Sequence, residues 1–439
     1  MSRVYEKQLE LDWRLPPNQL HQHALAQLAP HESAIRCVFG PHVSEVGLVD
    51  EPLARRTPFA FQARPVEDQE QFNVAYIVPT GVGAAQGGHA GDATPVLKAI
   101  AAVSDHVFTH PNVVNASDIN EIPDNAFYIE GSLLSAFLMG TIGLIRRTSN
   151  RVLVLIGNHD ERYVEAAVNT INAARATYGF NCSDMAMVPL EMNAAWSPSG
   201  RASGEIVGID NVWRELSEHE GTFDAVAITS PITIDTAERD YYLEQTKGES
   251  VNPWGGIEAL LTHTIAANIN LPVAHAPMME SREVEKLHYG IVDARVAAEM
   301  ISFSFLQCVL KGLQRAPAVT TNPQDRNAFS ATNVNAMVIP RGCFGLPIYA
   351  ALHQGIQVIA VADQIYAEDQ TNLIRSLPWQ TNQYTEVANY KEALGELTCL
   401  KAGISPASIT RPLVTMRLTT GAEQLVTRLQ NSMVKEKSL

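Results

Sequence analysis

Cysteine is scarce in this sequence, and its spacing excludes two kinds of site. An odd number of separated cysteines, with no C-x-x-C pair, predicts reduced thiols and excludes both a disulfide framework and a zinc knuckle. This usage is typical of a cytoplasmic protein, which is the location we expect. The five cysteines are Cys37, Cys182, Cys308, Cys343 and Cys399.

Long apolar runs are also missing. The longest, at residues 132–145, is shorter than a bilayer-spanning helix and is followed by Arg146 and Arg147. The N-terminus begins with charged residues and has no apolar core, so no secretory signal is predicted. We expect a buried helix over this run and no membrane partner, and we note that so apolar a helix also suits a homo-oligomer interface.

Basic residues are in the minority. There are 32 Lys and Arg residues against 47 Asp and Glu residues, a net charge of −15, and no basic cluster. This balance excludes a nucleic-acid partner. The chain has 46% hydrophobic and 18% charged residues, so it can bury a sizeable core. Its 439 residues suit two to three domains or one large α/β unit.

From about residue 70 onward, short β-branched runs alternate with helical periods. This alternation predicts an α/β fold with a largely parallel, helix-covered sheet, in which two lobes are one arrangement. The predicted strands span residues 73–79, 106–110, 126–129, 151–156, 225–228, 272–275, 336–340 and 357–362. The predicted helices span residues 95–103, 133–144, 164–178, 256–267, 294–313 and 347–354.

Composition divides the chain into four predicted segments. Residues 1–70 are rich in Pro and charge, which predicts an irregular N-terminal extension with an accessory role. A Ser-, Gly- and Pro-rich loop at residues 193–205 separates a first α/β lobe (71–192) from a second (206–365). The pattern weakens beyond Asp363, so residues 366–439 are expected to form a peripheral segment.

Five glycines fall between residues 81 and 91, after a predicted strand and before a predicted helix. Glycine lets the backbone approach a ligand closely, and the amide groups at a helix N-terminus favour an anion. The loop lacks the G-K-[ST] of a Walker A motif and a proper G-x-G-x-x-G spacing. The expected ligand-binding residues here are Thr80, Gly81, Gly83, Gly88, Gly91 and Asp92. The structural alternative is a tight turn in which Asp92 or Thr94 caps a helix.

A second glycine-rich turn precedes the predicted helix at residues 347–354. Gly342 and Gly345 would form another anion cradle, to which Arg341 adds charge. The same strand–turn–helix–strand segment also suits a glycosyltransferase-like donor site, which we keep as an alternative.

Five titratable side chains fall at predicted strand ends or helix starts, where sites form in α/β proteins. They are expected to be catalytic acids and bases: His89, His110, Glu130, Glu258 and His275. Three of them, His110, Glu130 and His275, are donors that iron, manganese or zinc accepts, so a divalent metal is a second interpretation. The structural role for Glu130 is a charge at a helix N-terminus. His263 lies about 140° around the helix from Glu258, so the two are not expected to face one ligand.

The tetrapeptide at residues 157–160, G-N-H-D, occurs in metallophosphoesterases, where it helps to hold two metals and a phosphate. The partner motifs G-D-x-x-D and G-H-x-H are absent from this chain. A metallophosphoesterase-like hydrolase is therefore an alternative and not our first hypothesis.

Several segments, in order, resemble a family described as a domain of unknown function, found largely in photosynthetic bacteria and plants. They are IVPTGVGAAQGGHAGDATP, THPNVVNAS, YIEG, NPWGGIEALLTH, VAHAP and VDARVAAEMIS. The likeness runs from about residue 73 to 365 and leaves out the first 70 residues and the tail. It implies that these glycines, histidines and acids belong to one recurring design, and it implies no activity.

Taken together, these features predict an enzyme that acts on a small anionic metabolite, phosphorylated or carboxylated. The chemistry would be acid–base or divalent-metal catalysis in a cleft lined by the glycine-rich loops. The rival from another class is a non-catalytic regulator that binds a nucleotide or metabolite. The catalytic hypothesis requires that the candidate residues, far apart in the chain, come together in the fold.

Overall fold

The computed structural model describes residues 2–40, 43–53, 57–79, 93–114, 122–157, 160–197, 202–237, 253–278, 305–362 and 383–415. The chain forms two compact units, Met1–Leu397 and Thr398–Leu439. Helix α14 (Tyr390–Ala402) crosses the boundary between them, and α15 (Pro406–Ile409) lies in the second unit.

A six-stranded parallel sheet forms one part of this unit. Its strands are β4 (Asn73–Tyr76), β5 (His106–Thr109), β6 (Ala126–Tyr128), β16 (Ala336–Pro340), β17 (Gln357–Val361) and β18 (Tyr384–Val387). The order across the sheet is β18-β17-β16-β4-β5-β6, and every neighbouring pair is parallel. The chain therefore builds outward from β4 in one direction and from β16 in the other, so the topological switch point lies between these two strands.

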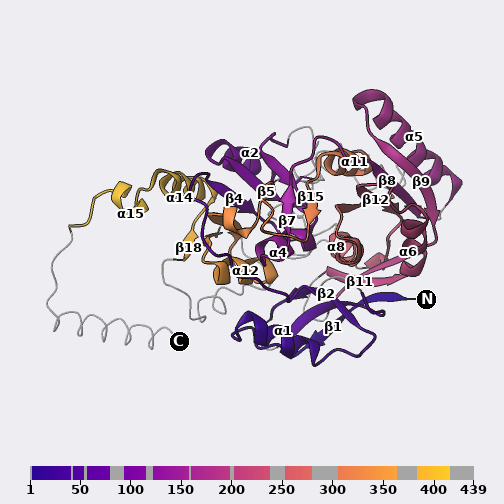
Figure 1. Ribbon diagram of the computed structural model, residues 1–439, viewed down its shortest axis with the longest axis horizontal. Coiled ribbons are helices and arrows are strands. Elements are labelled where there is room, and N and C mark those ends of the chain that lie inside the picture. Colours follow the sequence, from indigo (N-terminus) through magenta and orange to yellow (C-terminus); the bar gives the residue numbers. More distant parts are fainter. Residues whose placement is uncertain are drawn as a thin grey trace. The chain divides into compact units, whose positions relative to one another are not determined.

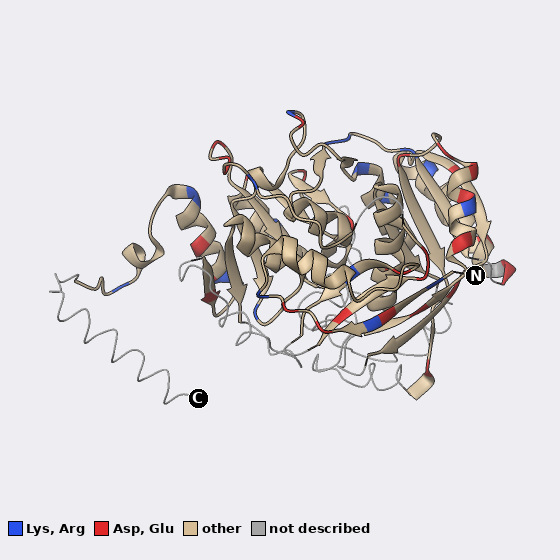
Figure 2. Ribbon diagram, turned by 60° about the horizontal axis from the view of Figure 1, so that its bottom comes forward, with Lys and Arg blue, Asp and Glu red and all other residues tan. Residues whose placement is uncertain are grey.

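A four-stranded sheet is also fully parallel and also has one topological switch point. Its strands are β8 (Val152–Gly157), β9 (Cys182–Val188), β12 (Ala225–Ser230) and β14 (Val273–Pro277), in the order β14-β12-β8-β9. All three pairings are parallel, and the switch point lies between β8 and β12. The inner strands are buried along their whole length, as expected for strands covered on both faces. Figure 2 accordingly shows few charged residues on these strands.

A third sheet of six strands packs beside them. It consists of β1 (Arg3–Leu9), β2 (Ser33–Val38), β3 (Ser44–Val49), β10 (Glu191–Trp196), β11 (Ala202–Val207) and β13 (Thr233–Ile234). Its order is β13-β10-β11-β1-β3-β2, and all pairs except β10–β13 are antiparallel. We call it the antiparallel sheet.

The antiparallel sheet corrects two expectations. The N-terminal extension is not irregular, because it forms β1, β2, β3 and α1 (Pro17–Leu25). Residues 193–205 are not simply a loop between lobes, because β10 and β11 pair across them as a hairpin with six matched residue pairs. Both regions alternate polar and apolar residues over short runs, and pairing with distant strands decides their structure.

All four strands of the four-stranded sheet lie, in the sequence, between two short strands, β7 (Gly143–Ile145) and β15 (Ala318–Thr320). Strand β7 follows α4 (Gly131–Leu138), and β15 precedes β16. These two short strands pair with each other in antiparallel fashion. The chain thus leaves the six-stranded sheet through β7 and returns to it through β15.

The predicted α/β fold with helix-covered parallel sheets is confirmed. All eight predicted strands occur, and helices α2 (Thr94–Val103), α5 (Glu161–Tyr178) and α12 (Leu346–Gln354) lie where they were expected. The helix predicted at residues 133–144 ends early, since Gly140 has a positive φ of 76° and β7 follows. The predicted helix at 294–313 is described only from the start of α11 (Phe305–Arg315). Helix α6 (Ile209–Glu218) was not predicted.

Helix α8 (Pro253–Ile269) is the central packing element. It contacts β14 of the four-stranded sheet, β10 and β11 of the antiparallel sheet, and α4, and Figure 1 shows it between α4 and β12. A helix that is apolar on every side is a buried helix. Its few polar side chains must therefore find partners inside the protein.

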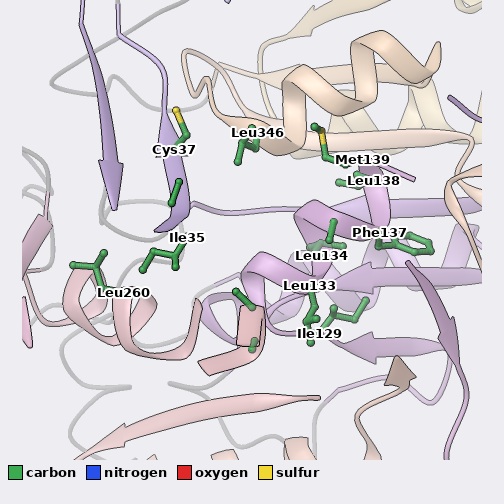
Figure 3. Packing of buried hydrophobic residues seen from close by; sticks show 14 of the residues in the cluster. Ile35, Cys37, Ile129, Leu133, Leu134, Phe137, Leu138, Met139, Leu260 and Leu346 are labelled. Carbon is green, nitrogen blue, oxygen red and sulfur yellow. The ribbon is translucent and has the colours of Figure 1, made fainter. Parts of the chain in front are cut away.

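The core at α8 joins side chains from four elements. In Figure 3, side chains of β2, α4, α8 and α12 converge on one cluster. The labelled residues are Ile35, Cys37, Ile129, Leu133, Leu134, Phe137, Leu138, Met139, Leu260 and Leu346. The apolar face of α4 is thus covered within the chain, which removes it as a reason to expect a homo-oligomer. In the part of the chain that the structure describes, no helix is long and apolar enough to cross a membrane.

Candidate functional site

The carboxyl edge of the four-stranded sheet brings β8 and β12 together at their last residues. Gly157 ends β8 and Ser230 ends β12. A Cβ placed on Gly157 would lie only 2.6 Å from the Cβ of Ser230. Because glycine has no side chain, β8 can lie this close to Ser230. Ser230 therefore lies at the switch point, where open α/β sheets bind their ligands.

His275 comes from the neighbouring strand β14 and is hydrogen-bonded through both ring nitrogens. Its Nε2 lies 2.9 Å from Ser230 Oγ, and its Nδ1 lies 2.8 Å from Glu258 Oε1. A carboxylate accepts hydrogen bonds and cannot donate them, so the proton of a neutral imidazole belongs on Nδ1. Nε2 is then an acceptor, and the Ser230 hydroxyl donates to it. We call these three residues the serine–histidine–glutamate set.

Burial differs along this set. The side chain of His275 is 0% exposed and Ser230 is likewise 0% exposed, whereas the Glu258 side chain is 25% exposed. Met192 Sδ also lies 3.0 Å from Ser230 Oγ and is a weak acceptor. The set therefore runs from a partly hydrated carboxylate to a dry hydroxyl at the strand end.

The position of Glu258 depends on how α8 packs. A Cβ on Gly256 would lie 2.4 Å from backbone atoms of Ala202, so only glycine lets the helix approach β11 this closely. The guanidinium of Arg36 on β2 donates to the carbonyl groups of Gly256 and Ala202 at 3.3 and 3.2 Å. Arg36 also forms an ion pair with Glu6. The antiparallel sheet thus fixes the first turns of α8, from which Glu258 projects.

A second group of polar side chains surrounds Glu130, which follows β6 and is the N-cap of α4. Its Oε2 accepts hydrogen bonds from the backbone N–H groups of Ser132 and Leu133 at 2.9 and 3.0 Å and from the Ser132 hydroxyl at 2.5 Å. Its Oε1 accepts from Thr262 Oγ1 at 3.3 Å and lies 3.3 Å from His263 Nε2. The Glu130 side chain is 1% exposed. We call this the Glu130 set.

His110 lies next to this group, directly after β5. Its Nε2 accepts a hydrogen bond from the Val78 N–H at 3.1 Å, an arrangement that requires an unprotonated nitrogen. Burial and, to a smaller extent, the charge of the neighbouring His263 lower the pKa of His110 to about 4. The residue is therefore a neutral imidazole at physiological pH.

Helix α8 supplies partners to both sets. Glu258 bonds His275, and Thr262 and His263, about one helical turn further on, contact Glu130. Three of the five residues predicted to be catalytic (Glu130, Glu258 and His275) thus lie in two sets along one helix, and a fourth, His110, lies next to the Glu130 set. Glu258 and His263 face different partners, in agreement with their angular separation. His263 is not a surface residue, because its side chain is only 17% exposed and contacts Glu130.

The described residues do not gather metal ligands. Among them, no group of three His, Cys, Asp or Glu side chains is placed to hold a metal ion. His110, Glu130 and His275 accordingly do not form one ligand set: His275 uses both ring nitrogens, and the oxygens of Glu130 cap α4 and bond α8.

The structure bears on only one of the two predicted anion cradles. The residues of the first cradle lie outside the described part of the chain; they are Thr80, Gly81, Gly83, Gly88, His89, Gly91 and Asp92. Thr94 does not cap α2, because its hydroxyl donates to the Val113 carbonyl. In the second cradle, Gly342 has a positive φ of 84° and the Arg341 N–H donates to the Val361 carbonyl. Gly345 forms a β-bridge with Val38. These contacts do not test ligand binding by Arg341, Gly342 and Gly345, which stays a prediction.

Ser230 is the residue that our reading of the sequence missed. The signal was present, since an apolar strand ends in Thr229-Ser230 before Pro231. Such endings are common, however, and only the pairing of β12 with β8 and β14 shows that Ser230 is beside His275.

Comparisons with known proteins extend the resemblance noted in the sequence. The model of the family described as protein of unknown function DUF3326 matches residues 73–410. An uncharacterised lipoprotein of Synechococcus sp. is 31% identical over 345 residues, which cover 76% of this chain and 92% of that protein. A search of the solved structures gives no significant match. The family match contains both parallel sheets and both polar sets, and the chain therefore belongs to the DUF3326 family.

Proposed function

We propose that this protein is an enzyme that acts on a small anionic metabolite by acid–base chemistry, with His275 as the proton-transferring group and Glu258 as its partner. The observation that carries the proposal is the pair of hydrogen bonds on the buried His275 ring, one to a carboxylate and one to a hydroxyl. A histidine held in this way has a defined tautomer and an acceptor nitrogen that faces a hydroxyl.

The step assigned to these residues is a proton transfer through His275. Nε2 accepts a proton while Nδ1–H remains bonded to Glu258, and the imidazolium that results is stabilised by the adjacent carboxylate. The buried ring strengthens this interaction, since charges interact more strongly away from water. Glu258 therefore acts through His275, and its own partial exposure of 25% keeps it in contact with solvent.

The anionic character of the substrate rests on topology. The two glycine-rich segments of the sequence begin just after β4 and β16, which are neighbours at the switch point of the six-stranded sheet. Loops at such a point present backbone N–H groups to ligands. Glu130 follows β6 of the same sheet, and α8 contacts both Glu130 and His275, so we place the substrate between these loops and the proton-transferring group.

The test is a comparison of metabolite turnover. The purified full-length protein is incubated with a small-molecule extract, and consumed compounds are identified by mass spectrometry. The wild-type protein is expected to consume an anionic compound, and His275→Gln is expected to slow this by about 10²-fold or more. The matched control is His219→Gln, because His219 also pairs with a carboxylate, Asp184, at 3.4 Å but lies outside both sets. Equal turnover by His275→Gln and wild type would exclude the proposal.

A cytoplasmic location is part of the proposal. It is supported by the five cysteines, which are all free thiols. The Synechococcus relative is named a lipoprotein, and we do not transfer that name to this protein. Fractionation of the native host, with detection by antibody, should place this protein in the soluble fraction. Recovery with the membranes would contradict this part of the proposal.

A further inference from the structure

We infer that Ser230 is a catalytic nucleophile and that the reaction is acyl transfer from an ester or thioester of a small carboxylic acid. This inference rests on the proposed function, since it uses His275 as the base, and it adds the reacting atom and the bond that breaks. Three features of the structure carry it: the place of Ser230 in the sheet, the direction of its hydrogen bond, and the close approach of β8 that Gly157 permits.

The place of Ser230 is the switch point of the four-stranded sheet. It is the last residue of β12, and β8 and β14 flank it as parallel neighbours. A hydroxyl at the carboxyl end of a central strand lies where ligands of α/β sheets bind. Gly157 on β8 provides the room, since any side chain there would collide with the Ser230 Cβ.

The direction of the hydrogen bond makes the hydroxyl a proton donor. Because Glu258 accepts from Nδ1–H, the Nε2 lone pair points at Ser230 Oγ, 2.9 Å away. This is the order of roles in serine nucleophiles generally: a hydroxyl, a base bonded to it, and a carboxylate that orients the base. The arrangement is recognised by geometry and not by the order of residues in the chain.

The proposed reaction has two steps. In the first, the Ser230 O–H bond breaks, the proton moves to His275 Nε2, and Oγ forms a bond to the acyl carbon. The bond from that carbon to the alcohol or thiol then breaks, and the leaving group takes the proton from Nε2. In the second step a water molecule gives a proton to Nε2 and its oxygen bonds to the acyl carbon; the bond from that carbon to Ser230 Oγ then breaks, Oγ takes the proton from Nε2, and the carboxylic acid is released. The net reaction is hydrolysis of the ester or thioester.

Another buried serine in the described part of the chain provides a contrast. Ser132 Oγ lies 2.5 Å from Glu130 Oε2, so this hydroxyl donates to a carboxylate and caps the same helix end. This hydrogen bond joins Ser132 to the N-cap of α4, so its geometry serves the helix end. Nucleophilic reactivity is therefore expected at Ser230 and not at Ser132.

Covalent labelling tests the inference without knowledge of the substrate. The full-length protein is treated with phenylmethylsulfonyl fluoride, a compact reagent suited to a buried hydroxyl, and labelled peptides are mapped by mass spectrometry. One label is expected on Ser230, and His275→Gln is expected to slow labelling by about 10²-fold or more. The control variant is Ser104→Ala, since the Ser104 hydroxyl is also buried but donates to the Ile100 carbonyl; its labelling should equal that of wild type.

The outcomes separate this inference from the proposed function. No label on Ser230 in the folded wild-type protein overturns the inference, and this result does not depend on any variant folding. Turnover that survives in Ser230→Ala but is lost in His275→Gln also overturns it, while the acid–base proposal stands. A label on Ser230 that forms equally fast in His275→Gln overturns the assignment of His275 as base, and with it both proposals.

Discussion

The two polar sets of this protein contain the same pair of residue types and differ in what each carboxylate does. Glu130 pairs with His263, and Glu258 pairs with His275. In the Glu130 set the carboxylate is 1% exposed and accepts hydrogen bonds from two backbone N–H groups and two hydroxyls. In the serine–histidine–glutamate set the histidine is the buried member and the carboxylate is 25% exposed.

This difference separates a structural role from a catalytic one. Protonation of Glu130 would weaken the cap of α4 and the contacts to α8, so the charge of this group is tied to the fold. His275 can accept a proton without such a loss, because Glu258 stabilises the charged ring and remains partly hydrated. On our proposal, the first set stabilises the fold and the second transfers protons.

The largest effect is expected from Glu258→Gln. The amide keeps the size of the side chain but no longer stabilises a charged His275, so turnover of the substrate should fall about 10²- to 10³-fold. The free energy of unfolding should change little, because Glu258 is partly exposed. Turnover is measured as in the metabolite experiment and stability by urea unfolding. A variant that loses stability in proportion to activity would assign Glu258 to the structural role.

Glu130→Ala should have the opposite signature. It removes the N-cap of α4 and one interaction each of the Thr262 hydroxyl and the His263 ring, which should cost about 3 kcal/mol of unfolding free energy. Turnover per folded molecule should stay within a few-fold of wild type. Urea unfolding followed by circular dichroism measures the loss. Unchanged stability with lost turnover would reverse the roles of the two sets.

His110 should make stability depend on pH. Its pKa is about 4 in the fold against an ordinary value of 6.5. A depressed histidine pKa means that the unfolded chain binds the extra proton, so the stabilisation is complete above pH 6.5 and is lost as pH falls towards 4. The loss should be up to about 3 kcal/mol.

The measurement is urea unfolding of wild type and His110→Gln at several pH values. The variant should show a shallower decline below pH 6.5, although not a flat one, because burial also lowers the pKa of His353 to about 4. Parallel declines in the two proteins would contradict the account of His110.

The smallest effect is expected from Asp224→Asn. Asp224 pairs with Arg151 at 2.9 Å where β8 and β12 begin, at the opposite end of the strands that carry the candidate site. The pair is partly exposed and contacts none of the residues of the serine–histidine–glutamate set. Labelling of Ser230 and turnover should therefore match wild type. A reduced labelling rate would show that the state of the whole sheet, and not the local hydrogen bonds, controls Ser230.

Much of the fold could be predicted from the sequence, because the strands of the parallel sheets are short apolar runs bounded by turns. The antiparallel sheet could not be predicted in this way. Strands β1 and β11 pair although about two hundred residues separate them, and Val4 faces Ile206 only in the folded chain. Strands such as β1 and β11 contain several charged or small residues and lack a clear apolar run, so they look like surface loops until their partner is known.

The candidate site was predictable in part for a similar reason. Glu130, Glu258, His275 and His110 stand out because they are titratable residues at the ends of apolar runs. A serine at such a place carries no charge and gives no comparable signal. The strand pairings β14–β12 and β12–β8 provide the missing information, since they bring Ser230 to His275.

The protonation of the His275 ring tests the central claim most directly. Nitrogen-15 NMR of histidine-labelled full-length protein at neutral pH, assigned by comparison with His275→Gln, reports which ring nitrogen carries the proton. The account predicts a neutral ring protonated on Nδ1, and a changed Nδ1 signal in Glu258→Gln. A proton on Nε2 alone, or a ring that does not respond to Glu258→Gln, would contradict it.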